Sequence, residues 1–142
     1  MVIRVIESLV RVLFILNLIL IAIWDLKYLK IPDKLLGSLL VLSTIISILK
    51  GTILVNMYSS FLVFLIMTIF SLTTKLGGGD IKLISIIGMT FGPKTILAIF
   101  MVSNILSGLI GLVLIIFKKA KFDTKIPLGP SIVLVSLLLL IK

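Results

Sequence analysis

Two residue types that supply much of protein chemistry are missing from this 142-residue sequence, which has no cysteine and no histidine. Without cysteine the chain can form neither a disulfide nor a thiolate nucleophile, and without both residues it cannot build a Cys/His zinc site. Without histidine it lacks a Ser-His-Asp triad and a histidine proton shuttle. We expect no metal and no cofactor, so any chemistry must use carboxylates, lysine, hydroxyls or backbone groups.

Acidic residues are scarce as well. Fourteen lysine and arginine residues stand against five acids, which gives a formal net charge of +9. Such a charge is typical of proteins that bind nucleic acid, but these cations are scattered at the ends of apolar runs rather than gathered on one face. We interpret them as membrane-flanking charges and predict no nucleic-acid partner. The acids are Glu7, Asp25, Asp33, Asp80 and Asp123.

Long hydrophobic runs dominate what is present. Apolar residues make up 61% of the chain and the mean hydropathy is +1.42, far above the roughly half-apolar composition of a soluble domain. The uncharged runs 51–74 and 95–117 contain 24 and 23 residues, and about 20 residues cross the hydrocarbon layer as a helix. We predict an all-α, polytopic membrane protein whose residues 1–142 form a single domain embedded in the lipid bilayer. We predict six apolar segments, at about residues 9–28, 34–49, 52–72, 81–91, 95–117 and 126–141.

The fourth apolar segment is short. The 14 residues from Asp80 to Pro93 rise only about 21 Å as a helix, so the segment could cross a thinned bilayer or turn back. If all six segments cross, nine cations lie on one side and five on the other, whereas a re-entrant fourth segment gives seven on each. The positive-inside rule therefore favours six crossings, with both termini extracytoplasmic. Asp25 and Asp80 then lie at the same depth, near the cytoplasmic face.

Asp25 ends a run of 13 uncharged residues, a position where an acid costs free energy unless it is solvated, paired or protonated. One interpretation is an interfacial acid paired with Lys27 or Lys30, with Trp24 and Tyr28 as headgroup anchors. The other is a functional acid. Position in the sequence alone leaves both open.

Asp80 follows three consecutive glycines, Gly77, Gly78 and Gly79, and precedes an apolar run. An Asp in this place is an ordinary helix N-cap, and glycines before it are an ordinary loop. Three glycines, however, remove every Cβ from the approach to the acid, so a second backbone such as that of a substrate could come close.

The other three acids have simple structural explanations. Asp33 follows a proline and precedes an apolar segment, which favours an N-cap over a direct catalytic role. Asp123 lies in a basic loop and is predicted to be a surface charge. Glu7 lies between Arg4 and Arg11, where local pairing on a helix is expected.

Taken together, these motifs resemble the prepilin and preflagellin peptidase family of GxGD intramembrane aspartic proteases. The family's first-aspartate segment is matched by residues 25–33, which begin with Asp25 and end in Ile-Pro-Asp. Its Gly-x-Gly-Asp segment is matched by residues 77–80, followed by Lys82, and residues 126–130 resemble the Pro-x-Gly-Pro that opens its last helix. Presenilin-type proteases share Gly-x-Gly-Asp, but the Ile-Pro-Asp motif favours the prepilin branch. The resemblance covers nearly the whole chain.

The resemblance implies an aspartic endopeptidase that removes the basic leader from prepilin- or preflagellin-like proteins at the cytoplasmic face of the plasma membrane. Asp25 and Asp80 would be its catalytic pair. Lys82 would either orient the substrate or extend to the membrane interface. Long bacterial members have a cysteine-bearing region and also N-methylate their product, so this cysteine-free chain is predicted to lack methyltransferase activity. The implied substrate-binding or supporting residues are Gly77, Gly78, Gly79, Lys82, Pro32 and Asp33.

Two other classes of function remain open at this stage. A small ion- or proton-coupled transporter would also place acids in the membrane, although it has no need for three glycines before Asp80. A noncatalytic assembly subunit would need neither acid. The sequence does not determine the oligomeric state, and a homo-oligomer is one of the possibilities.

Overall fold

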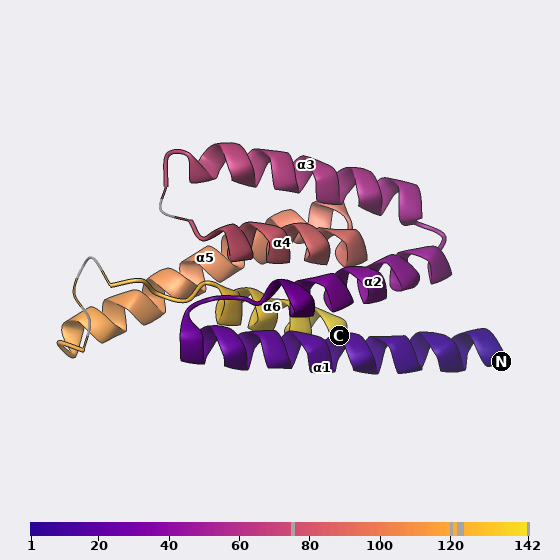
Figure 1. The fold of residues 1–142 in the computed structure, drawn as a ribbon, viewed down its shortest axis with the longest axis horizontal. Helices are drawn as coiled ribbons and strands as arrows, with labels where there is room; N and C mark the ends of the chain where they lie inside the picture. Colours follow the sequence, from indigo (N-terminus) through magenta and orange to yellow (C-terminus); the bar gives the residue numbers. More distant parts are fainter. Residues whose placement is uncertain (75, 120, 122–123, 142) are drawn as a thin grey trace.

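The computed structural model describes residues 1–74, 76–119, 121 and 124–141, and in these ranges the chain forms six α-helices (Figure 1). Each helix overlaps one of the six predicted apolar segments, so the all-α prediction is confirmed. The helices are α1 (Val2–Tyr28), α2 (Asp33–Leu49), α3 (Ile53–Ser71), α4 (Gly78–Phe91), α5 (Pro93–Ile116) and α6 (Gly129–Ile141).

Three of these helices, α1, α3 and α5, are long and apolar enough to cross a membrane, and α6 is a shorter apolar helix. Their outer faces expose large apolar side chains, for example Phe61 on α3 and Ile105 on α5, which are 63% and 65% exposed. Lipid solvates such faces, whereas water does not. These helices indicate a multi-pass membrane protein.

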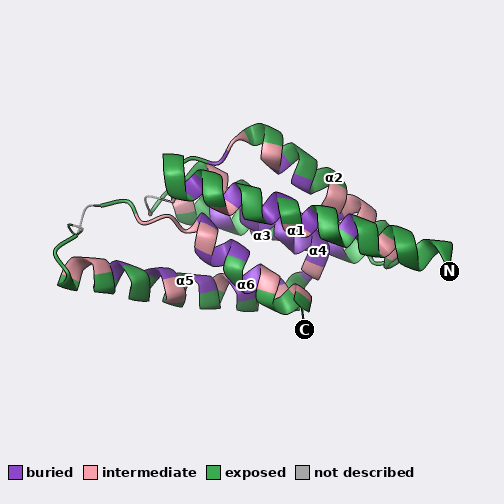
Figure 2. Cartoon of the chain, turned by 90° about the horizontal axis from the view of Figure 1, so that it is seen from below, coloured by how far each residue is buried: buried purple, intermediate pink, exposed green. Residues whose placement is uncertain are grey.

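Helix α4 is the most deeply buried element. Ile81 and every residue from Leu83 to Thr90 are buried, and the helix packs against α2, α3, α5 and α6. In Figure 2 its buried residues lie behind α1. Because neighbouring helices surround α4, the roughly 21 Å length of its 14 residues need not match the bilayer thickness.

Three helix starts differ from the prediction by three residues or more. Helix α4 begins at Gly78 rather than at residue 81. Helix α1 begins at Val2, well before the first apolar segment, and ends at Tyr28. Leu29 has a left-handed backbone (φ 52°) and caps the helix by donating its N–H to the Asp25 carbonyl over 2.8 Å. Helix α6 begins at Gly129 rather than near residue 126. A proline inside a helix removes a backbone hydrogen bond, so Pro127 stays outside the helix while Pro130 lies in its first turn, where proline is tolerated.

Candidate active site

Asp25 lies in the last turn of α1 and points into the protein, with only 5% of its surface exposed. Its Oδ2 atom is buried and has no hydrogen-bond partner among the described residues. Neither Lys27 nor Lys30 forms an ion pair with it in the described chain, because Lys27 lies instead over the Tyr28 ring, 5.3 Å from its centroid. The interpretation of Asp25 as an acid paired with these lysines is therefore wrong.

Asp80 lies in the first turn of α4, but it is not the N-cap. Gly77 holds that position with an extended backbone (φ −72°, ψ 138°), and no side chain caps the helix. The Asp80 N–H donates to the Gly77 carbonyl over 3.1 Å, so the N-cap interpretation of Asp80 is wrong. Its half-buried carboxylate lies at the positive end of the α4 dipole, a favourable place for negative charge.

The two aspartates line one polar pocket of about 520 Å³. They also line an adjoining recess of about 80 Å³, together with Lys125 and Pro127. The pocket walls come from the end of α1, the connection to α2 and the start of α4, and Asp33 and Lys82 are among them. Helices α1 and α4 thus place two carboxylates, which are widely separated in the sequence, in a common cavity.

The three glycines before Asp80 all line this pocket, but they differ in what surrounds them. A Cβ on Gly77 would lie 3.2 Å from Asp80 Oδ2, and one on Gly79 would lie 3.2 Å from the Ile31 Cβ. A Cβ on Gly78 would meet nothing within 4 Å. Gly79 therefore lets the start of α4 pack against the segment that precedes α2, and Gly78 leaves open space beside Asp80.

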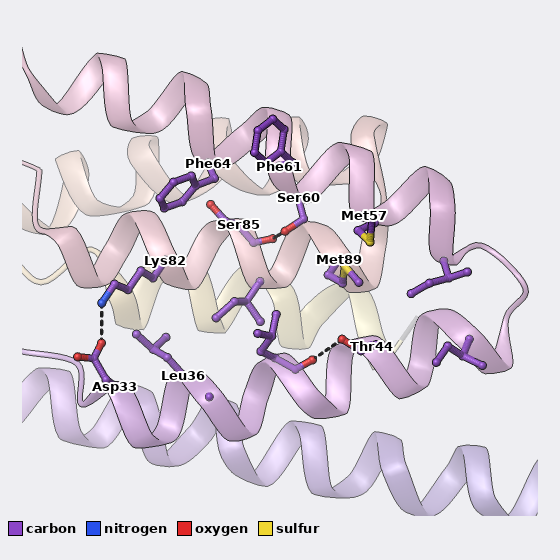
Figure 3. A pocket seen from close by; sticks show the side chains of 15 residues that line it. Asp33, Leu36, Thr44, Met57, Ser60, Phe61, Phe64, Lys82, Ser85 and Met89 are labelled. Carbon is purple, nitrogen blue, oxygen red and sulfur yellow. Dashed lines mark hydrogen bonds and ion pairs between the residues drawn. The ribbon is translucent and has the colours of Figure 1, made fainter.

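Asp33 and Lys82 form an ion pair, with 2.7 Å between Asp33 Oδ1 and Lys82 Nζ (Figure 3). The pair joins the first residue of α2 to the first turns of α4. Pro32 occupies the N-cap position of α2 and no side chain caps the helix, so the N-cap interpretation of Asp33 is wrong. Hydrogen bonding and charge from Lys82 lower the pKa of the solvent-exposed Asp33.

Sequence reasoning missed the contribution of the connection between α5 and α6. Lys125 lines both cavities that contain the aspartates, and Gly129 packs against Asp25 so closely that a Cβ there would lie 2.5 Å from Oδ2. The signal was present, because residues 126–130 stood out as a Pro-x-Gly-Pro motif. Nothing in that motif specifies that its glycine touches Asp25.

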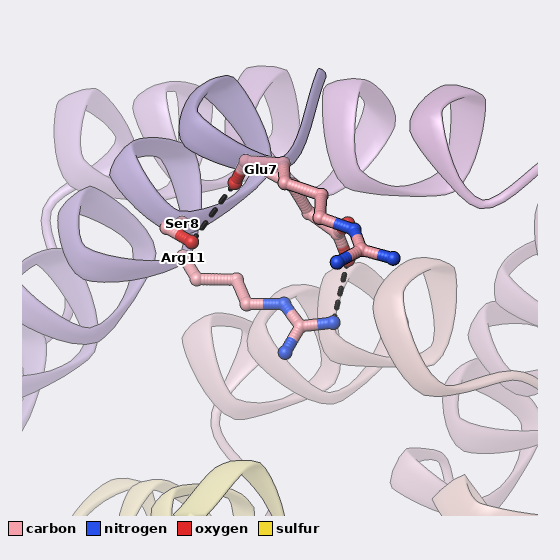
Figure 4. Close-up of polar contacts among 4 residues, drawn as sticks. Glu7, Ser8 and Arg11 are labelled. Atoms are coloured by element: carbon pink, nitrogen blue, oxygen red, sulfur yellow. Dashed lines mark hydrogen bonds and ion pairs between the residues drawn. The ribbon is translucent and has the colours of Figure 1, made fainter. Parts of the chain in front are cut away.

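The remaining acids lie elsewhere. Arg11 donates to Glu7 over 2.5 Å, one helical turn away on α1 (Figure 4), so the predicted local pairing is confirmed. Asp123 lies outside the described residues. Among the residues that the structure describes, no cluster of three or more acidic side chains could hold a metal ion.

Comparison with known families shows which family the chain belongs to. The sequence model of the type IV leader peptidase family matches residues 12–116, from the middle of α1 to the end of α5. The chain belongs to the type IV leader peptidase family. This confirms the resemblance found in the sequence, and membership implies aspartic-type cleavage of prepilin-type leader peptides. Neither the curated proteins nor the solved structures gave a match.

Proposed function

We propose that Asp25 and Asp80 are the catalytic pair of an intramembrane aspartic endopeptidase. The observation that carries the proposal is their shared pocket. Asp25 is buried without a cation partner, and a buried carboxylate is costly unless it is paired or protonated. A second carboxylate beside it makes a shared proton favourable, because like charges at close range cannot both ionise.

Because the pair holds one proton, it provides both a general base and a general acid for the reaction. The ionised carboxylate accepts a proton from a water molecule as the water oxygen attacks the scissile carbonyl carbon. The protonated carboxyl donates its proton to the developing oxyanion, which gives a tetrahedral diol. The carboxyl that accepted the water proton then donates it to the leaving nitrogen as the C–N bond breaks, and one hydroxyl of the diol returns a proton to the other carboxylate, which restores the shared proton. The pair titrates as one unit, so the base and the acid are not assigned to individual residues.

The charge distribution supports a site at the cytoplasmic face. With six crossings, Asp25 and Asp80 lie at the end that carries the lysine-rich connections, and both termini are extracytoplasmic. A leader peptidase substrate has a basic leader followed by an apolar helix, so its scissile bond lies near this face. The open space at Gly78 lets an extended backbone approach Asp80.

The cysteine-free chain is proposed to cleave without methylating its product, and no cofactor is involved in the proposed steps. Mass spectrometry of the product formed in the presence of S-adenosylmethionine tests this point. The expected product carries a free, unmethylated amino terminus. An added methyl group would contradict the proposed restriction while leaving the peptidase assignment intact.

The peptidase assignment is tested by Asp25→Asn and Asp80→Asn in purified protein reconstituted with a prepilin-like substrate. Each variant is expected to lose at least roughly a hundredfold in cleavage rate, the lower range of a general acid or base. Glu7→Gln is the matched control, because it makes the same chemical change in an exposed pair far from the pocket. Near-normal cleavage by either aspartate variant would contradict the proposal, and substrate-dependent proton flux without cleavage would favour a transporter.

A further inference from the structure

A third cavity lies beside the polar pocket. It is an open groove of about 860 Å³ between α2 and α3, and α4 forms its floor (Figure 3). The lining residues of α2 run from Asp33 to Ile48, a stretch of roughly 22 Å at the rise of an α-helix. Its walls include Leu36, Leu40, Met57, Phe61 and Phe64.

The hydroxyl groups in the groove are already used within the protein. Ser60 donates to the Ser85 carbonyl over 2.7 Å, Ser85 to the Ile81 carbonyl over 2.7 Å, and Thr44 to the Leu40 carbonyl over 2.8 Å. The walls therefore offer few free donors to a ligand. Their chemistry suits an apolar occupant.

The groove and the polar pocket meet at one place. Asp33 and Lys82 line both cavities, so their ion pair marks the junction. The two aspartates lie on one side of this pair, and the apolar groove lies on the other side. A ligand that extends through both cavities must change from polar to apolar at the Asp33–Lys82 pair.

We propose that the groove holds the apolar helix of the leader peptidase substrate while the scissile bond lies at Asp25 and Asp80. This inference rests on the proposed function and adds the substrate-binding surface. A peptide segment within the hydrocarbon layer must be helical to satisfy its backbone. Gly37 lines the groove, is exposed and has no Cβ, so the backbone of another helix can approach it closely.

The order of the two cavities argues for the substrate over a lipid chain or a second copy of the protein. The substrate is polar up to the cleavage site and apolar beyond it, the same sequence of environments that the pocket and the groove present. A lipid chain would fill the groove but has no group that needs the connection to the aspartates. A second copy would occupy the groove without regard to the pocket.

Gly37 gives a direct test, because it lines the groove and a Cβ there would meet nothing within 4 Å. Gly37→Leu therefore adds bulk to the groove without an internal clash at its Cβ. Gly108→Leu is the matched control, since Gly108 lies on α5, is exposed, and has equally free space. The assay compares two synthetic substrates, one with the basic leader, cleavage site and an apolar helix, and one that ends before the helix.

Gly37→Leu is expected to lower kcat/KM for the long substrate by roughly tenfold, in line with the cost of overfilling a packed surface, and to spare the short substrate. Gly108→Leu should leave both unchanged. Normal cleavage of the long substrate by Gly37→Leu would overturn the inference and leave lipid or a second copy as the occupant. If the unsubstituted protein cleaves neither substrate, the proposed function itself fails.

Photo-cross-linking keeps the inference testable if Gly37→Leu folds poorly. A photoreactive residue replaces Leu40 in the groove or, as the control, exposed Leu109 on α5, each in the Asp80→Asn background that holds uncleaved substrate. We expect an adduct with the long substrate from position 40 and none from position 109. No adduct from position 40, or equal adducts from both, would overturn the inference.

Discussion

Replacing Gly129 by alanine should displace the Asp25 carboxylate while leaving the helix bundle folded. A Cβ at Gly129 would lie 2.5 Å from Asp25 Oδ2 and 3.1 Å from Cγ, whereas ordinary van der Waals contact begins at 3.4 Å. The oxygen must therefore move by about 0.9 Å, the difference between the first and the last of these distances. A misplacement of about 1 Å in an active site can cost roughly a hundredfold in rate, so we expect Gly129→Ala to lower kcat by about that factor.

The assay for Gly129→Ala is cleavage of the long substrate, with thermal unfolding measured on the same preparation. The φ of Gly129 is not in the left-handed region, so alanine can adopt its backbone conformation. The atoms nearest to the added Cβ all belong to the side chain of Asp25, so the melting temperature should change little. Gly108→Ala is the matched control, because a Cβ there meets nothing within 4 Å. If Gly129→Ala cleaves within a factor of about three of the unsubstituted protein, the contact with Asp25 does not position a catalytic group.

Three further predictions concern the same pocket. Gly77→Ala places a Cβ 3.2 Å from Asp80 Oδ2, a milder clash, so its kcat should fall between those of Gly129→Ala and Gly108→Ala; an effect larger than that of Gly129→Ala would contradict this ordering. Asp33→Asn and Lys82→Gln should each lower kcat/KM several-fold. The double variant should be no worse than either single variant, because each substitution removes the same ion pair. Strictly additive losses would show that the two residues act independently rather than through their ion pair. The pH profile of kcat/KM should be bell-shaped, since cleavage needs one carboxylate ionised and its partner protonated. A flat profile between about pH 3 and 8, measured on an enzyme that stays folded over this range, would argue against a shared proton.

Most of the fold could be predicted from the sequence. Helix existence follows from uncharged runs long enough to cross a bilayer, and the structure places a helix on each of them. Asp25 and Asp80 stood out because acids are rare in such a chain and costly beside apolar segments. The placement of both at one end of the bundle followed from counting charges on the connections.

The lateral packing of the helices could not be predicted in the same way. In a membrane both lipid-facing and protein-facing positions are apolar, so hydropathy does not distinguish the buried helix α4 from the largely exposed helix α3. The Asp33–Lys82 pair and the contact of Gly129 with Asp25 depend on this packing. Neither contact could be predicted, because each joins residues that are distant in the sequence.

Cysteine cross-linking in the membrane tests most directly whether Asp25 and Asp80 form one site. The chain has no native cysteine, so Asp25→Cys/Asp80→Cys introduces the only two thiols. Ile31→Cys/Gly79→Cys is the positive control, because the Cβ positions lie 3.2 Å apart, and Asp25→Cys/Gly108→Cys is the negative control. We predict that a short bifunctional thiol reagent joins positions 25 and 80 about as efficiently as the positive control. Cross-linking no greater than in the negative control would contradict the shared pocket on which the proposed mechanism depends.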